Sequence, residues 1–307
     1  MKIITLTLNP AFDLHCFVKN FEPYHENLAD ISSLDAGGKG VNISRALISL
    51  GVENKALVVL GKENGDAFRK ALAKDGTDSI FIELEGRIRE NITLHTENSP
   101  ETRISFRGFS ADASLLHRVE ASLSGKVDSD TVVTFTGSLP DGVSVEDAKN
   151  MLKGLKTKGA KIVIDSRSFK LDDIKELYPW LIKPNEEEIQ MYSRVKVTDL
   201  ESAAIAAAEL QKSCAENVII SLGDKGAVLA CKEGSFTSTA PKIKALSTVG
   251  AGDSMIAGFI AATQTHRPPL DTLKFAVSCG SAACLTEGTT PPQKATITAL
   301  LQQLEVK

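Results

Sequence analysis

Short runs of apolar residues alternate with longer amphipathic stretches along most of the chain. The short runs are rich in valine and isoleucine and are too short for helices, so they predict buried β-strands. These predicted strands cover residues 2–8, 56–60, 131–135, 161–165 and 217–222.

The stretches between these runs carry apolar residues at helical spacing, and glycine closes them, as it closes many helices. They cover residues 40–51, 66–76 and 145–159. Strands that alternate with helices predict an α/β fold, with a mostly parallel sheet covered on both faces. The last third is mainly helical in pattern, with a predicted hairpin at 226–239.

Two segments interrupt this order, at residues 15–35 and 86–108. The first contains "CFVKNF" and "LADISSL" as candidate strands, and the second reads as a β-hairpin with "ENSPE" between its strands. They could be two separate surface insertions. They could also pair into a small β-flap over the ligand-binding edge of the sheet.

Composition narrows the functional class. The 307 residues, 42% of them hydrophobic, suit one large domain, so we treat 1–307 as a single unit. The formal net charge of −4 offers no basic surplus for nucleic acid. No apolar run approaches the length of a membrane span. The five cysteines are scattered without a CxxC pair, which favours a reduced, cytoplasmic protein without disulfides or zinc.

Polar residues gather where the predicted strands end. Open parallel sheets bind ligands outside the carboxyl ends of their strands, so these positions are candidate site residues. The residues that follow strands or strand-like runs are Asp13, Ser138, Asp165, Asn185, Glu188 and Gly223.

The stretch "DAGGKGVN" at 35–42 is rich in glycine and opens a predicted helix. Glycines let the backbone approach a ligand closely, and a helix N-terminus favours anions. The stretch is not a Walker A loop, because Gly40 rather than Ser or Thr follows Lys39. A tight strand-to-helix turn is the alternative interpretation.

The stretch "STVGAGDSMIAGF" at 247–259 predicts a buried helix from about Ala251. The backbone amides of Gly250, Ala251 and Gly252 at its N-terminus need an acceptor, and a phosphate is a good candidate. Asp253, in the first turn, could simply cap the helix. It could also be a general base that takes a proton from a hydroxyl attacking that phosphate.

These two stretches together resemble the two signatures of the ribokinase-like (PfkB) carbohydrate kinases. "TLNPAFD", "GSLPDG", "KPNEEE" and "SLGDKGA" are also similar to family segments, so the resemblance spans the whole chain. "TLNP" with "GSLP" resembles the branch of 1-phosphofructokinase and tagatose-6-phosphate kinase. The resemblance implies a ribokinase-like α/β/α sandwich with a mostly parallel central sheet and a small β-sheet lid, formed by about 14–35 and 87–109.

The resemblance also implies roles for matching residues. Asp253 would be the general base, beside an anion hole of Gly250, Ala251 and Gly252. Residues that would contact the sugar phosphate are Asp13, Gly37, Gly38, Lys39, Asn42, Arg89, Asn91 and Ser138. Residues that would contact the nucleotide are Lys183, Asn185, Ser221, Gly223, Gly226, Cys279 and Gly280. Asn185 and Glu188 would organise Mg²⁺, largely through water.

The second lid strand departs from the family pattern. It reads "TRISFRGFS", with Arg103 where an acidic residue is common, a further cation at Arg107, and Gly108-Phe109 in place of a Gly-Pro pair. Arg103 and Arg107 could be a solvated edge. Alternatively, Arg103 makes an altered contact to the substrate.

The resemblance implies an ATP-dependent kinase, with MgATP as donor, that converts a ketohexose monophosphate into a 1,6-bisphosphate. Fructose 1-phosphate is the favoured substrate, and tagatose 6-phosphate and fructose 6-phosphate are alternatives. A non-catalytic sugar-phosphate sensor is a remote alternative. A dehydrogenase of similar architecture is a third, and the chain lacks the GxGxxG fingerprint that such an enzyme would carry. The family pattern also suggests a homodimer through the lid, although Phe17, Phe21 and Ile31 could equally pack within one chain.

Overall fold

A computed structural model of the chain describes residues 1–97, 101–193 and 195–305. The strands are β1 (Lys2–Thr7), β2 (Ala11–Phe17), β3 (Asp30–Gly37), β4 (Lys55–Gly61), β5 (Ser79–Leu84), β6 (Arg89–His95), β7 (Thr102–Ile104), β8 (Thr131–Thr136), β9 (Lys161–Asp165), β10 (Leu181–Ile182), β11 (Asn217–Ser221), β12 (Ala227–Cys231) and β13 (Gly234–Ser238). The helices are α1 (Lys39–Ser49), α2 (Gly65–Lys74), α3 (Ser114–Ser122), α4 (Val145–Thr157), α5 (Leu171–Leu177), α6 (Glu186–Tyr192), α7 (Leu200–Ser213), α8 (Ala251–Gln264), α9 (Pro269–Ala283) and α10 (Lys294–Glu305), with a 3₁₀ turn η1 (Gly223–Lys225).

Within the described residues, nine strands form the central sheet in the order β13-β12-β11-β10-β9-β8-β1-β4-β5. Neighbours from β5 to β11 run parallel, and β12 and β13 are antiparallel additions. All five predicted core strands and the hairpin at 226–239 are confirmed, as are the three predicted helices. The apolar patterns did not reveal the edge strand β5 or the strand β10, which has only two residues.

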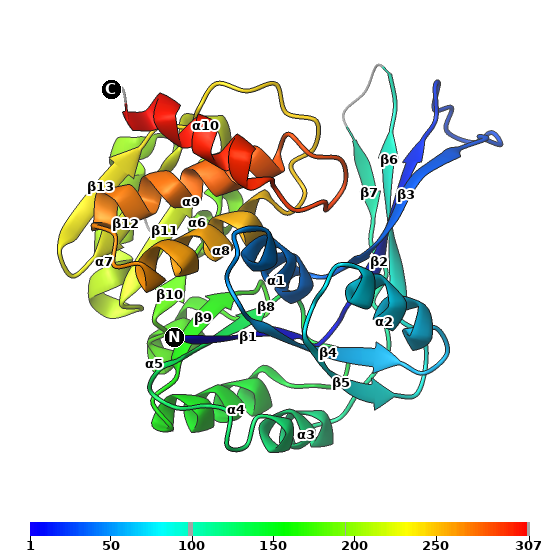
Figure 1. The fold of residues 1–307 in the computed structure, drawn as a ribbon, viewed down its shortest axis with the longest axis horizontal. Helices are drawn as coiled ribbons and strands as arrows, with labels where there is room; N and C mark the ends of the chain where they lie inside the picture. Colours follow the sequence, from blue (N-terminus) through cyan, green and yellow to red (C-terminus); the bar gives the residue numbers. More distant parts are fainter. Residues whose placement is uncertain (98–100, 194, 306–307) are drawn as a thin grey trace.

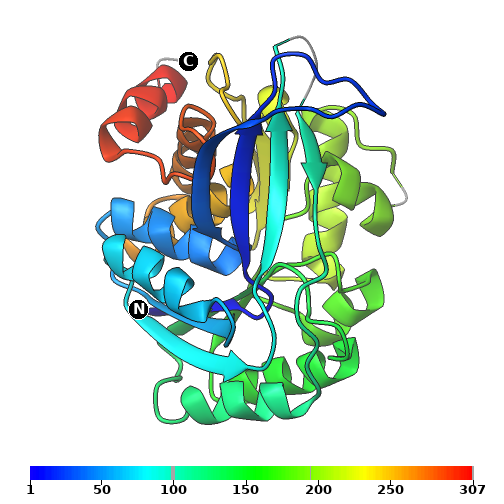
Figure 2. The same ribbon diagram turned by 90° about the vertical axis from the view of Figure 1, so that its right-hand side faces the viewer.

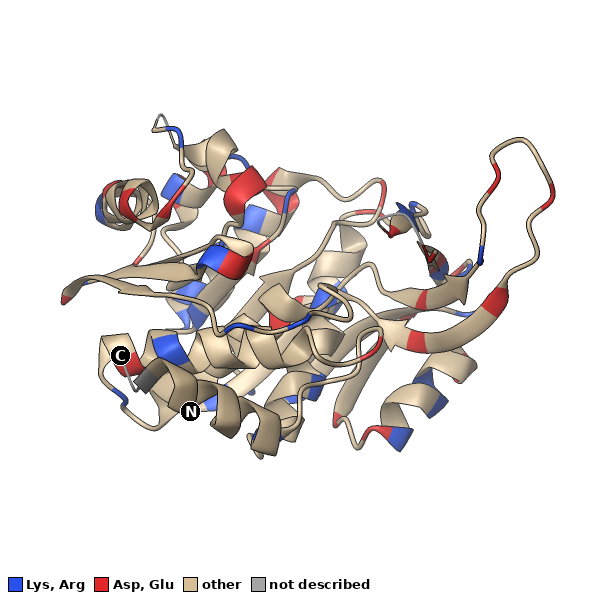
Figure 3. Cartoon of the chain, turned by 90° about the horizontal axis from the view of Figure 1, so that it is seen from above, with Lys and Arg blue, Asp and Glu red and all other residues tan. Residues whose placement is uncertain are grey.

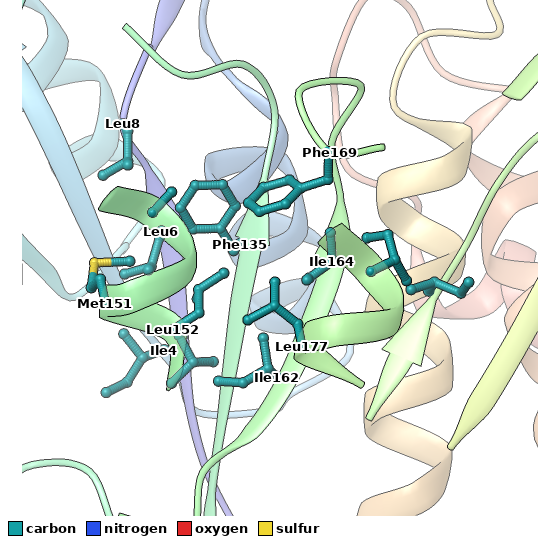
Figure 4. Packing of buried hydrophobic residues seen from close by; sticks show 14 of the residues in the cluster. Ile4, Leu6, Leu8, Phe135, Met151, Leu152, Ile162, Ile164, Phe169 and Leu177 are labelled. Carbon is teal, nitrogen blue, oxygen red and sulfur yellow. The ribbon is translucent and has the colours of Figure 1, made fainter. Parts of the chain in front are cut away.

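Helices cover both faces of this sheet, so its strands are buried on both sides. Successive residues of β1 belong to the hydrophobic cores on opposite faces of the sheet. Ile3 lies in the core with α1, α8 and α9, whereas Ile4 and Leu6 lie in the core with α4. Figure 4 shows the second of these cores, in which Phe135 meets Phe169 edge-on with ring centroids 5.4 Å apart. A parallel sheet buried in this way leaves only its strand ends for chemistry.

The two interrupting segments form a second, four-stranded sheet in the order β3-β2-β6-β7, which stands up from the core (Figures 1 and 2). The flap interpretation is therefore confirmed over separate insertions. The predicted strand 16–21 was placed too late, because β2 ends at Phe17, and the predicted strand 28–34 only overlaps β3. The hairpin of β6 and β7 is confirmed, although 98–100 of its loop lie outside the described residues.

This second sheet, called the lid below, has two contrasting faces. Residues that pair directly across strands share a face. One transverse row is polar and consists of Asp35, Asp13 and Asn91. The neighbouring row, on the other face, is apolar and consists of Leu34, Leu14, Ile92 and Ile104. The polar row faces the core, where a Cβ on Gly288 would lie 2.9 Å from the Asp35 carboxylate.

No helix among the described residues is long and apolar enough to cross a membrane. Basic and acidic positions are interspersed along the chain when it is seen from above (Figure 3).

Candidate active site

Several of the candidate residues meet at the carboxyl edge of the central sheet, where the lid joins the core. Asp165 ends β9, Lys183 follows β10, and Ser221 ends β11. The first turns of α1 and α8 reach the same edge and bring Asn42 to Asp253. The structure thus brings together two sequence signatures that lie more than 200 residues apart.

Asp253 lies in the first turn of α8 and is only 5% exposed. Its carboxylate makes no capping hydrogen bond, and its Oδ2 instead accepts one of 2.9 Å from Asn42 Nδ2. The N-cap is Gly250, whose left-handed φ of 75° suits glycine. The helix-cap interpretation of Asp253 is not supported, because the hydrogen bond that its carboxylate accepts within the described residues comes from Asn42 of α1.

Burial raises the pKa of the Asp253 carboxyl to about 6, against the opposing attraction of Lys39 and the hydrogen bond from Asn42. The nearby Asp165 charge raises it further. A carboxyl with a pKa of this size is ionised near neutral pH and is still a much better proton acceptor than an ordinary aspartate.

Backbone amides are available beside this carboxylate. Among the described residues, Gly250 and Gly252 donate no backbone hydrogen bond, while Ala251 donates to the Thr248 carbonyl at 3.4 Å. A Cβ on Gly252 would lie 2.9 Å from Lys183 Nζ, so this glycine lets the ammonium approach the amides. The N-terminus of a buried helix with a lysine beside it is suited to an anion.

Asp165 holds two lysines at this edge. Its Oδ2 accepts a 2.8 Å hydrogen bond from Lys39 Nζ, and Lys183 Nζ lies 3.8 Å from its Oδ1. Burial alone would raise the pKa of Asp165, but the two lysines lower it. For Lys39 burial opposes the charge, and attraction to Asp165 and Asp253 raises its pKa. Asp165 and Lys39 are therefore charged at neutral pH, and Asp165 positions both lysine side chains.

Asp13 lies in the polar row of the lid. Its Oδ1 accepts a 3.0 Å hydrogen bond from Asn91 Nδ2, and burial raises the pKa of its carboxyl. Gly37, on the neighbouring strand β3, pairs with Ala11, two positions beyond the partner of Asp13, and a Cβ there would overlap Asp13 Oδ2 at 1.9 Å. Gly38, with φ 117°, is the N-cap of α1. These two glycines therefore keep space for the Asp13 carboxylate and for the turn into α1.

Ser138 and Arg89 join a second polar group at the base of the lid. Asn9 Nδ2 donates to Ser138 Oγ at 3.1 Å and to the Arg107 carbonyl. Arg89 donates to the carbonyls of Phe106 and Asn9, and burial lowers the pKa of its guanidinium. Arg89 therefore ties β6 to the segment that follows β7 and to Asn9, which precedes β2.

The two unusual lid arginines differ in environment. Arg103 pairs with Glu101 and donates to Thr248 Oγ1 at 3.4 Å, so it reaches the loop that leads into α8. Arg107 is 88% exposed and lies 3.9 Å from Asp141. The solvated-edge interpretation fits Arg107, whereas Arg103 bridges the lid and the core.

The residues predicted to contact the nucleotide lie along the edge beyond Asp165. The backbones of Asn185 and Ser221 pair in a parallel bridge, and Gly223 and Gly226 frame the turn η1. A Cβ on Gly226 would lie 2.0 Å from the Ser238 carbonyl oxygen, so only glycine fits there.

Cys279 and Gly280 have a packing role in α9. The Cys279 side chain is fully buried against Gly258 of α8, where a Cβ would lie 2.7 Å from its Sγ, and Gly280 packs against the Ala251 carbonyl. The geometry offers no open surface on the Cys279 side chain for a nucleotide.

Asn185 and Glu188 form a reciprocal capping box at the start of α6, and Arg167 Nε donates to Glu188 Oε1 at 3.0 Å. These oxygens are already engaged. Among the described residues, no group of three or more histidine, cysteine, aspartate or glutamate side chains could hold a metal ion. These existing contacts are compatible with the prediction that Asn185 and Glu188 act on Mg²⁺ largely through water.

Two contributors were missed by the sequence reasoning. Asn9 follows the first strand, so the rule that selected the other strand ends could have found it. Arg167 carries no sequence signal, because its pairing with Glu188 depends on the approach of the segment after β9 to the first turn of α6.

Comparison with known proteins agrees with this geometry. The sequence of residues 8–296 matches the pfkB family of carbohydrate kinases. The chain is 30% identical to the 1-phosphofructokinase of Vibrio cholerae serotype O1, covering 99% of this chain and 96% of the relative, and 33% identical to that of Escherichia coli K12, covering 92% and 90%. The crystal structure of Escherichia coli phosphofructokinase-2 in complex with substrates and products has a TM-score of 0.93 at 26% identity, covering 99% of this chain and all of the other.

Proposed function

The chain belongs to the pfkB family of carbohydrate kinases, and from that premise we propose that it phosphorylates fructose 1-phosphate at its 6-hydroxyl with ATP. The products would be fructose 1,6-bisphosphate and ADP. The observation that carries the proposal is Asp253, a buried carboxylate with a pKa raised to about 6 beside open helix amides. The curated 1-phosphofructokinases that resemble the chain over nearly its whole length support the choice of sugar.

In the proposed reaction, Asp253 accepts the proton of the sugar hydroxyl as its oxygen attacks the γ-phosphorus. The bond between that phosphorus and the bridging oxygen of ADP breaks. The amides of Gly250 and Gly252, with Lys183 beside them, would stabilise the negative charge that spreads over the transferred group. The hydrogen bond from Asn42 holds the base in position.

The sugar would lie between Asp13, Gly37, Gly38 and Asn42. Asn42 Oδ1 and Asn91 Oδ1 are buried acceptors without partners in the described residues, and sugar hydroxyls would supply the missing donors. Its phosphate would meet Arg89, Ser138 and Arg103 at the lid. Lys39 would share its charge between that phosphate and Asp165, to which it is already bonded.

The nucleotide would lie along Ser221, Gly223 and Gly226, with its phosphates toward Lys183. Mg²⁺ bound with ATP supplies charge neutralisation on those phosphates. Glu188 and Asn185 would act on it largely through water, since their oxygens already accept hydrogen bonds from the first turn of α6 and from Arg167.

A screen of ADP release tests the proposal. Fructose 1-phosphate, tagatose 6-phosphate, fructose 6-phosphate and the free sugars would be compared at equal concentration in a coupled assay. We expect the highest kcat/KM with fructose 1-phosphate. A higher value with tagatose 6-phosphate or fructose 6-phosphate would replace the substrate and keep the mechanism. ADP release with none of the sugars would favour a non-catalytic sensor.

We also propose that two chains pair through the apolar face of the lid. Leu34 is 58% and Ile104 48% exposed in one row, and Ile31 and Phe21 add exposed apolar surface nearby. A continuous exposed apolar surface is typical of an interface. Leu34→Glu should shift the mass in solution from dimer to monomer, as measured by light scattering, whereas Ile205→Glu on exposed α7 serves as the control. A monomeric native chain would contradict the proposal.

A further inference from the structure

A cavity lies at the edge of the central sheet opposite the candidate active site. It has a volume of about 290 Å³ and is lined at the amino-terminal ends of β10 and β11, by Trp180 and Asn217 among others. The C-terminal turn of α8 and the first turn of α9 close its other side. None of the residues assigned to phosphoryl transfer lines it, and its size is close to that of small-molecule sites.

The floor of this cavity is apolar and aromatic. Trp180, Phe259 and Leu229 line it and are 6%, 3% and 1% exposed. The rings of Trp180 and Phe259 lie 5.3 Å apart between centroids and are tilted by 54°. Aromatic surfaces in this arrangement favour a flat ring as their partner, through stacking and edge contacts.

The guanidinium of Arg267 lies at the rim of the cavity, against an aromatic ring and without a carboxylate partner in the described residues. The Arg267 guanidinium lies 4.4 Å above the centre of the Phe275 ring, and within the described residues it makes no ion pair and no side-chain hydrogen bond. The contact with Phe275 holds the guanidinium at the rim, and its N–H groups have no acceptor in the described residues. A planar fork of this kind suits a carboxylate, which it can bind with two parallel hydrogen bonds.

The surrounding charges favour an anion on balance. Lys161 Nζ lies 5.4 Å from the centre of the Trp180 ring, and the positive end of the 15-residue helix α9 begins at Pro269 on the rim. Glu233 is the one carboxylate among the lining residues and opposes an anion. It accepts a hydrogen bond from the Cys231 thiol, whose pKa burial raises to about 11.

His266 lies at the same rim and has an unusual backbone conformation. Its φ of 55° is left-handed, and its amide donates to the Thr263 carbonyl just past the end of α8. Glycine is the usual residue at such a helix end, since a side chain there is disfavoured by about 1 kcal/mol. The chain instead carries an imidazole that lines the cavity.

We propose that this cavity binds a small planar carboxylate, with its ring against Trp180 and Phe259 and its carboxylate on Arg267. Such a ligand would contact the last turns of α8, whose first turn carries Asp253 about 20 Å away along the helix. The proposal does not depend on which sugar the enzyme phosphorylates.

Trp180 is the only tryptophan of the chain, so its fluorescence reports on this cavity alone. Benzoate is the probe, and benzamide is its neutral counterpart of the same shape. We expect saturable quenching by benzoate, with benzamide at least about tenfold weaker because it lacks the charge-assisted hydrogen bonds. Equal affinities for the two probes, or no saturable response, would overturn the proposal.

Variants locate the ligand. Arg267→Gln should weaken benzoate binding about tenfold, whereas Arg118→Gln on the exposed surface of α3 should leave it unchanged. Glu233→Gln should tighten it. Thr263→Phe, which fills the cavity from α8, should abolish the response while circular dichroism and kinase turnover stay normal. Unchanged binding in Arg267→Gln or in a folded Thr263→Phe would refute the assigned position.

Discussion

The central sheet and the lid use their apolar residues in opposite ways. In the central sheet, Ile3 and Ile4 of β1 point to opposite faces and both are buried under helices. In the lid, the polar row that contains Asp13 faces the core, while Leu34 in the neighbouring row is 58% exposed. The strands of the central sheet are therefore buried on both faces, whereas the lid turns its polar row toward the core.

This contrast suggests a division of labour between the two sheets. Asp253, Asp165 and Lys183 are each at most 5% exposed and are carried by the core. The side chains expected to meet the sugar, such as Asp13 and Arg89, are carried by the lid. Changes in the core should therefore act on turnover, and changes in the lid should act on the apparent affinity for the sugar.

The largest effect is expected from Asp253→Asn. The amide preserves the hydrogen bond from Asn42 but cannot accept the proton of the sugar hydroxyl. Turnover should fall roughly 10²–10⁴-fold, with a small change in KM, as measured by steady-state ADP release. Turnover within a few-fold of the native value would remove Asp253 as the base.

The same substitution should stabilise the fold at high pH. Because burial raises the pKa of Asp253 to about 6, above its ordinary value of 3.8, the folded state loses stability as the pH rises through this window. At pH 8 the variant should gain about 2–3 kcal/mol in the free energy of unfolding, and at pH 4 the gain should vanish. Urea unfolding at both pH values measures this, and an equal gain at both would contradict the raised pKa.

Gly37→Ala tests the lid side of the comparison. The added Cβ would overlap Asp13 Oδ2 at 1.9 Å and push that carboxylate away from the sugar. We expect KM for the sugar to rise about 10–100-fold, with a smaller change in kcat. Gly154→Ala in α4 is the control, since the nearest atom there is the end of the flexible Glu120 side chain. A loss confined to kcat would contradict the proposal that the lid acts on the apparent affinity for the sugar and the core on turnover.

Glu188→Gln should raise the Mg²⁺ concentration needed for half-maximal turnover by about tenfold, if the carboxylate orients water around the metal. Glu187→Gln is the matched control, because Glu187 is a more exposed neighbour that also lies near Arg167. An unchanged Mg²⁺ titration in Glu188→Gln would leave its capping of α6 as its only role.

The smallest effect is a shift in pH profile for Lys39→Met. Lys39 lowers the pKa of Asp253 by its charge, so its removal should move the acidic limb of kcat/KM upward by about one pH unit. Turnover of the native enzyme should itself rise as the pH increases through about 6, where Asp253 loses its proton. Lys62→Met at the exposed surface is the control and should leave the acidic limb of kcat/KM at the same pH.

Sequence patterns were reliable where one physical signal dominated. The predicted core strands are mostly apolar, with buried threonines as their main polar residues, because strands covered on both faces favour apolar side chains, and each was found within a residue or two. The lid strand at 16–21 was misplaced because its apolar residues do not face a core: Phe21, on which the pattern relied, lies outside the strand and is 48% exposed.

The sequence by itself determined the order of strands and helices and the glycines at the two signature loops, and it marked Asp253 as the candidate base. Only the tertiary structure decided the surroundings of this carboxylate, because Asn42, which donates a hydrogen bond to it, is 211 positions away. It also decided that Asp165 holds Lys39 and Lys183, and that the lid turns its polar face inward. These outcomes depend on burial and on the distance between charges, and both exist only once the chain has folded.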